Sequence, residues 1–143
     1  MKNRNHDWRA DFPIEEDVED FRGQLRRFVI TCEERGLGFT VRTRERDVEE
    51  GYEFAAYSET SPYSALGRVR EKMRRALATR HITGAPGNVR MLHDRIAGRI
   101  TSDGAGGVLL VVDGVPLSLS DLESILASHE GWAFELRITD ALE

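Results

Sequence analysis

The sequence holds a single cysteine, four prolines and only 8% aromatic residues among its 143 residues, and it contains no long hydrophobic run. One cysteine cannot form a disulfide within the chain, and no apolar stretch approaches the roughly 20 residues of a membrane span. The first twelve residues also lack the apolar stretch of a signal peptide. We therefore expect a cytoplasmic protein, with no membrane partner and with a core that needs no disulfide.

The spacings that mark metal, nucleotide and hydrolase sites are missing as well. The four histidines show no H-x-x-x-H or H-E-x-x-H spacing, and neither glycine-rich loop matches a phosphate-binding motif. No serine stands in a G-x-S-x-G turn. Cys32 falls on a predicted apolar stripe, where burial makes a thiol a poor nucleophile. We expect no metal and no cofactor, and the pattern argues against an enzyme.

Charge is unevenly distributed along the chain. Counting along the sequence, residues 1–59 hold 10 basic and 15 acidic groups, residues 60–100 hold 9 and 2, and residues 101–143 hold 1 and 8. The net charge of −5 therefore conceals a basic centre between two acidic flanks. The acidic total argues against nucleic acid as an obligatory partner, whereas the basic centre leaves it as an alternative.

The pattern over residues 14–35 predicts a long helix. Pro13 suits a first helical turn, and the acidic run 15–17 favours the positive end of a helix dipole. Apolar residues recur at helical spacing. They are Val18, Phe21, Leu25, Phe28, Val29 and Cys32. Gly36 then follows as a helix stop.

Alternation with a period of two follows over residues 37–44 and 52–56, which predicts a β-hairpin, with a helix start at 47–50 as the alternative. Ser61-Pro62 opens a second helix. Its predicted apolar stripe is Tyr63, Leu66, Val69, Met73, Ala76 and Leu77. Arg68, Lys72 and Arg75 lie on the opposite side.

The remaining third of the chain predicts strands and one short helix. We expect a strand over 90–99, a buried strand over 108–112, an Asp113-Gly114 turn and a short edge strand over 115–117. A capping box from Ser120 to Glu123 predicts a helix that ends at Gly131. Trp132, Phe134, Leu136 and Ile138 then alternate with small or polar residues, which predicts a last strand that buries these four side chains.

These elements predict an α+β fold with a mostly antiparallel sheet, helices packed on one face and the order α-ββ-α-βββ-α-β. We expect a single domain over residues 1–143. The alternative is an N-terminal helix-hairpin appendage over 1–59 attached to a compact core over 60–143.

Two groups of residues are candidates for binding or chemistry. Arginine-rich positions on the second helix (residues 68–80) and the strand over 90–99 could bind phosphates or a protein partner, because guanidinium groups bind anions through paired contacts. The candidates are Arg68, Lys72, Arg75, Arg95 and Arg99. The alternative is a solvated face that balances the acidic flanks. His81, His93 and Asp94 form a small-molecule site only if their side chains meet in one cleft.

The second half of the chain, from residue 51 to residue 140, resembles a family of small, mostly bacterial domains of uncharacterised function. The resemblance rests on Arg74–His81, Gly98–Ile100, Leu110–Gly114, Leu117–Asp121 and above all Glu130-Gly-Trp-Ala-Phe-Glu-Leu-Arg-Ile-Thr-Asp140. It implies no activity. A ligand pocket beside Trp132 is an alternative to a purely structural role for that side chain.

With no catalytic constellation, segregated charge and a long amphipathic first helix, the sequence favours a non-enzymatic protein-interaction or regulatory module. Its partner would be another protein or a second copy of the chain. Nucleic-acid or polyphosphate binding is the second hypothesis, and a small-molecule enzyme is the third.

Overall fold

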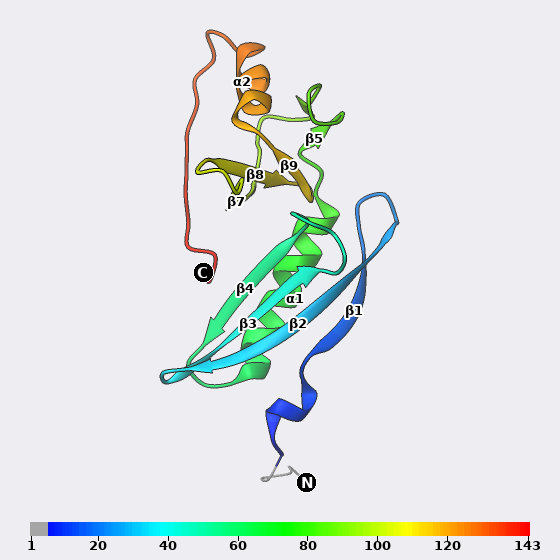
Figure 1. Cartoon of the computed structure of the whole chain (residues 1–143), viewed down its shortest axis with the longest axis vertical. Helices are drawn as coiled ribbons and strands as arrows, with labels where there is room; N and C mark the ends of the chain where they lie inside the picture. The colour runs from blue at the N-terminus through cyan, green and yellow to red at the C-terminus, as the bar shows by residue number, and fades with distance from the viewer. Residues whose placement is uncertain (1–5) are drawn as a thin grey trace.

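The computed structural model describes residues 6–143, which form three antiparallel sheets, of four, two and three strands, and two α-helices (Figure 1). The first half contains a 3-10 turn η1 (Trp8–Asp11), strands β1 (Ile14–Glu19), β2 (Leu25–Arg35), β3 (Gly38–Glu45) and β4 (Glu53–Ser58), and helix α1 (Pro62–Ala78). The second half contains β5 (Ile82–Thr83), β6 (Arg90–Met91), β7 (Gly98–Ser102), β8 (Val108–Val112), β9 (Val115–Leu117) and α2 (Leu119–Ala127). The α+β class and the mostly antiparallel pairing are as predicted, but the order of elements is not.

The helix predicted over residues 14–35 is wrong, because this stretch forms strands β1 and β2. Val18 pairs with Arg26 across the two strands, and the side chain of Asp20 accepts hydrogen bonds that close the turn between them. The apolar residues Phe28 and Ile30 are spaced by two and both are fully buried, which is the period of a strand. The helical spacing was misleading, because Phe21 lies in the turn between the strands and Leu25 is exposed, so neither belongs to the buried face.

The hairpin prediction is confirmed, because β3 and β4 pair antiparallel next to β2 in the order β1-β2-β3-β4. Helix α1 covers one face of this sheet (Figure 1). Ser61 caps the helix by accepting from the amide of Tyr63, and Pro62 occupies its first turn. The first hydrophobic core therefore joins α1 to the sheet. Its fully buried side chains are Phe28, Ile30, Val41, Ala56, Ala65, Val69, Met73 and Leu77.

A buried ionic network closes the end of this core. The side chain of Asp20 accepts from Nε of Arg26 at 2.9 Å, and Nη1 of Arg26 donates to Glu45 at 2.9 Å. Burial raises the pKa of the Asp20 carboxyl, but hydrogen bonds from Arg26 and from the amides of Gln24 and Arg22 outweigh it and leave that pKa below its ordinary value. Asp20 is therefore charged at neutral pH and holds the β1–β2 turn.

The second half folds around a smaller core. Strands β7, β8 and β9 form an antiparallel sheet in that order, and α2 packs beside it. The core contains Ile82, Val89, Val112, Leu117 and Ile125. The turn at Asp113-Gly114 and the short strand after it are as predicted, and both turn residues have positive φ.

Three predictions for the second half require correction. The strand over 90–99 is interrupted, because only β6 and β7 are regular and residues 92–97 are irregular. The capping box begins at Ser118 rather than Ser120, with Asp121 as its acidic partner. The last strand over residues 132–139 does not form, and its four large apolar side chains are exposed rather than buried.

Candidate interaction surface

Asp113 binds the start of β5 to the turn between β8 and β9. Its carboxylate accepts from the amides of His81 and Ile82 at 2.7 and 2.9 Å and contacts Nδ1 of His81 at 2.8 Å. Asp113 and His81 are both largely buried. The pair has the chemistry of a His–Asp dyad, and its hydrogen bonds join the start of β5 to the β8–β9 turn.

The other two members of the predicted small-molecule site do not join this pair. His93 and Asp94 are exposed, and neither side chain makes a hydrogen bond or ion pair with the part of the chain that the structure describes. Within residues 6–143, moreover, no three acidic, histidine or cysteine side chains gather where they could hold a metal ion. The structure thus gives His81 a structural partner and assigns none to His93 or Asp94.

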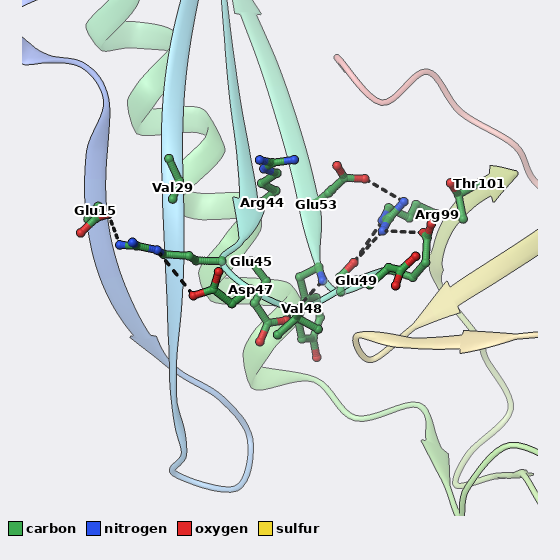
Figure 2. A pocket seen from close by; sticks show the side chains of 14 residues that line it. Glu15, Val29, Arg44, Glu45, Asp47, Val48, Glu49, Glu53, Arg99 and Thr101 are labelled. Atoms are coloured by element: carbon green, nitrogen blue, oxygen red, sulfur yellow. Dashed lines mark hydrogen bonds and ion pairs between the residues drawn. The ribbon is translucent and has the colours of Figure 1, made fainter. Parts of the chain in front are cut away.

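Arg99 connects the two halves of the molecule. Figure 2 shows its guanidinium reaching from β7 to the start of β4 and the loop before it. Nη2 donates to the carbonyl of Gly51 in this loop at 2.7 Å, and Nη1 lies 2.8 Å from Glu53, the first residue of β4. Glu50 lies 3.4 Å away on the same loop. The surrounding cleft has a volume of about 880 Å³ and is lined mostly by charged side chains. Arg99 is therefore engaged within the chain rather than facing a free anion site.

Arg68 and Lys72 cover the outer edge of the first sheet. Nη1 of Arg68 donates to the carbonyl of Tyr57 at 2.6 Å, and Nζ of Lys72 donates to the carbonyl of Ala55 at 2.7 Å. These two carbonyls are two residues apart on β4, an edge strand, so they point to the same side. The two basic side chains thus occupy hydrogen-bonding groups that another strand would need.

Lys72 has a second partner at the end of the chain. Its Nζ also donates to the carbonyl of Ala141 at 3.0 Å. Burial lowers the pKa of Lys72, and the nearby Arg68 lowers it further, while Asp140 and Glu143 raise it. The contact ties the C-terminus to α1 in the first half of the molecule.

The predicted basic residues are thus dispersed. Arg75 pairs with Glu71 one helical turn away at 2.6 Å, and Arg95 is exposed in the irregular stretch before β7. Arg68 and Lys72 lie along the edge strand β4, and Arg99 lies in the cleft between the halves. A shared role for the five in anion binding stays a prediction.

The most unusual surface of the molecule is residues 132–139, which we call the tail segment. Trp132, Phe134, Leu136 and Ile138 are between 71 and 86% exposed. Figure 1 shows the segment running extended from α2 back toward α1. Among the described residues, the backbone of 133–139 has no hydrogen-bond partner. Exposed apolar patches of this kind are typical of interaction sites and ligand-binding grooves.

Trp132 begins the tail segment and lines neither of the two pockets described for the chain, so a ligand pocket beside it stays a prediction. Its ring meets the His129 ring edge-on, with centroids 5.2 Å apart and an interplanar angle of 88°. The two pockets described, of about 880 and 510 Å³, are formed by other residues. Sequence reasoning identified this segment by its alternation, but it missed the exposure, because no local signal says where a strand finds its partner.

Cys32 lies on β2 rather than on a helix, half-buried against the first core, and burial raises the pKa of its thiol.

Neither helix in residues 6–143 combines the length and apolar character that crossing a membrane would require. The role of Asp113 was missed, since the sequence marks it only as a turn residue.

The fold and these contacts define an α+β protein of three antiparallel sheets with an exposed apolar tail. Residues 10–78 match a family model described as Domain of unknown function (DUF7686), and residues 81–143 match one described as Domain of unknown function (DUF7713). The comparisons with curated proteins and with solved structures each found no match. Both descriptions agree with the expected resemblance to domains of uncharacterised function, but two models match where one family over residues 51–140 was expected. The motif at 130–140 lies inside the second matched region.

Proposed function

We propose that the protein is a non-enzymatic interaction module that associates with a second copy of itself through the tail segment. The observation that carries the proposal is the exposure of four large apolar side chains on one short stretch. Exposed apolar area is unfavourable in water by about 25 cal/mol per Å², so a partner that covers this row gains a substantial free energy.

The tail segment has the properties of a docking strand. Its apolar side chains alternate with Ala133, Glu135, Arg137 and Thr139, so an extended conformation presents all four apolar groups on one face. Its unpaired backbone donors and acceptors are available to another strand. Recognition by added strands takes affinity from main-chain hydrogen bonds and specificity from alternate side chains.

A second copy is favoured over an unrelated partner for two reasons. Glu135 and Arg137 leave the segment without net charge, so two segments do not repel each other. In addition, each copy carries both an exposed docking strand and uncovered sheet edges, so a two-fold arrangement satisfies both copies at once. No contact in the described residues gives comparable support to nucleic-acid binding or to catalysis, which stay predictions.

Sedimentation-velocity measurements over a range of protein concentrations test the proposal. The wild-type chain is expected to form dimers, and Phe134→Ser/Leu136→Ser is expected to weaken dimerisation by about a hundredfold, because two buried apolar anchors are lost. Ala133→Ser/Thr139→Ser is the matched control on the opposite face and should dimerise like wild type. All these side chains are exposed, so none of the variants should unfold. A wild-type chain that stays monomeric at every concentration overturns the proposal.

A further inference from the structure

The two-residue strands β5 and β6 are too short to accept the tail segment. The four-stranded and the three-stranded sheets have four edge strands between them, and three of these are poor acceptors for an added strand. The edge of β4 is covered by Arg68 and Lys72, as described above. Strand β1 has an exposed carboxylate at every second position (Glu15, Asp17 and Glu19), and such charges discourage strand pairing. Strand β9 has only three residues, and Pro116 in its middle lacks the N–H that a ladder needs.

The remaining edge strand, β7, has none of these protections. It contains no proline, and its one charged side chain, Arg99, turns away to the loop before β4. Within residues 6–143, β7 pairs only with β8, so its other edge is unpaired. This edge is as long as β8 and offers five residues to a partner strand.

The apolar face of this sheet is also incomplete beside β7. Ile100 lies opposite Leu110, which lies opposite the buried Leu117, so the three side chains share the face that bears the second core. At the β7 end of that face, Ile100 is 56% exposed and the neighbouring Val108 is 41% exposed. One further strand with apolar side chains on this face would cover both.

From these observations we infer that the tail segment of one copy adds to the free edge of β7 in the second copy, and that the exchange is reciprocal. This rests on the proposed self-association and names its acceptor. The tail apolar residues then extend the row formed by Leu117, Leu110 and Ile100. Each three-stranded sheet becomes four-stranded, and both unpaired backbones are satisfied.

The area available suits a specific dimer. Two copies bring four aromatic rings to the contact, and each ring buries about 150–250 Å² when covered. With Leu136 and Ile138 added from both copies, the reciprocal contact clears the roughly 1,000 Å² that specific interfaces need. The tail of the same copy is held between α2 and the Lys72 contact with Ala141, and it leaves Ile100 uncovered.

A complementation experiment on the full-length chain tests the acceptor. Ile100→Lys places a charge on the free edge of β7, and we expect it to weaken dimerisation at least tenfold. Leu37→Lys, at an exposed apolar position in the turn between β2 and β3, is the control and should leave dimerisation unchanged. Mixing Ile100→Lys with Phe134→Ser/Leu136→Ser should restore a dimer, because one intact tail then meets one intact edge. Circular dichroism checks that each variant is folded.

Hydrogen exchange gives a second measurement. Amides in residues 98–102 and 133–139 should both be protected in the wild-type dimer and should both exchange faster in Phe134→Ser/Leu136→Ser. If Ile100→Lys dimerises like wild type, or mixing restores nothing, the tail docks elsewhere, for example tail to tail, and this inference is wrong while self-association stands. Protection of both segments in a monomer overturns exchange between copies. A wild-type chain without any dimer overturns the proposed function itself.

Discussion

Replacing Asp113 should destabilise the second half of the molecule more than any surface substitution. The carboxylate is buried and accepts from two amides, those of His81 and Ile82, while it also contacts the His81 ring. Alanine at this position leaves both amides without a partner. It must also adopt the φ of +54° that Asp113 has in the turn, which alanine does less readily than aspartate or asparagine.

The magnitude follows from these losses. Each buried amide left without an acceptor costs about 1–3 kcal/mol, and the left-handed backbone costs alanine about 1–2 kcal/mol more, so the loss of both acceptors in Asp113→Ala should lower the stability by about 3–8 kcal/mol. Asp113→Asn keeps one side-chain oxygen for the amides and tolerates the turn, so it should lose about 1–2 kcal/mol. The loss in Asp113→Asn reports the His81 contact, whereas the further loss in Asp113→Ala reports the amide contacts together with the backbone preference.

Urea unfolding followed by far-ultraviolet circular dichroism measures this prediction, with an unchanged denaturant slope as the sign that only stability has altered. Trp132 fluorescence is a poor reporter, because this side chain is exposed in the folded chain. Hydrogen exchange locates the effect: the Ile125 amide should lose protection, and that of Val69 in the first core should not. A loss under about 1 kcal/mol for Asp113→Ala would refute the reasoning, since the two amides would then have found other partners.

Three further predictions concern other contacts. Gly114→Ala should lose about 2–4 kcal/mol of stability in a thermal or urea melt, because its Cβ would lie 2.7 Å from the Tyr52 ring at a positive φ. Gly104→Ala is the control: it has open space around it and should lose only about 1 kcal/mol. Equal losses in the two variants would contradict the contact with the ring. The pKa of Asp20 is lowered in the folded chain. The stability that this carboxylate contributes is therefore present above its ordinary pKa of 3.8 and is lost as the pH falls below that value. Unfolding measured at a series of pH values should show a smaller loss of stability below pH 3.8 for Asp20→Asn than for the wild-type chain. Lys72→Met should speed amide exchange at residues 140–143 while costing under about 1 kcal/mol, and unchanged exchange there would show that Lys72 does not hold the C-terminus.

The elements that the sequence predicted well carry strong local signals. Helix α1 begins after Ser61 with a proline in its first turn, and its buried residues recur at spacings of three and four, which fit a helix and not a strand. The Asp113-Gly114 turn is specified by two residues that accept positive φ. In both cases the deciding interactions lie within a few residues of one another, so the sequence contains them.

Residues 14–35 show why a pattern can mislead. The apolar positions there fit helical spacing, while Phe28 and Ile30 also fit alternation, and residues 29–31 form a run rich in β-branched side chains that favours a strand. The choice was made by tertiary contacts, since β2 is an inner strand between β1 and β3 and its buried side chains share the first core with those of α1. Those partners lie outside the window that any local pattern reads.

For the tail segment, too, some properties are local in the sequence and others depend on the tertiary structure. The sequence by itself determined that residues 132–139 favour an extended strand with one apolar face, because alternation and side-chain type are local properties. Only the tertiary structure decided that this segment pairs with no strand among residues 6–143, and that Arg68 and Lys72 close one sheet edge while β7 stays open. Strand pairing depends on backbone groups brought together from distant positions, and their proximity is a property of the folded chain.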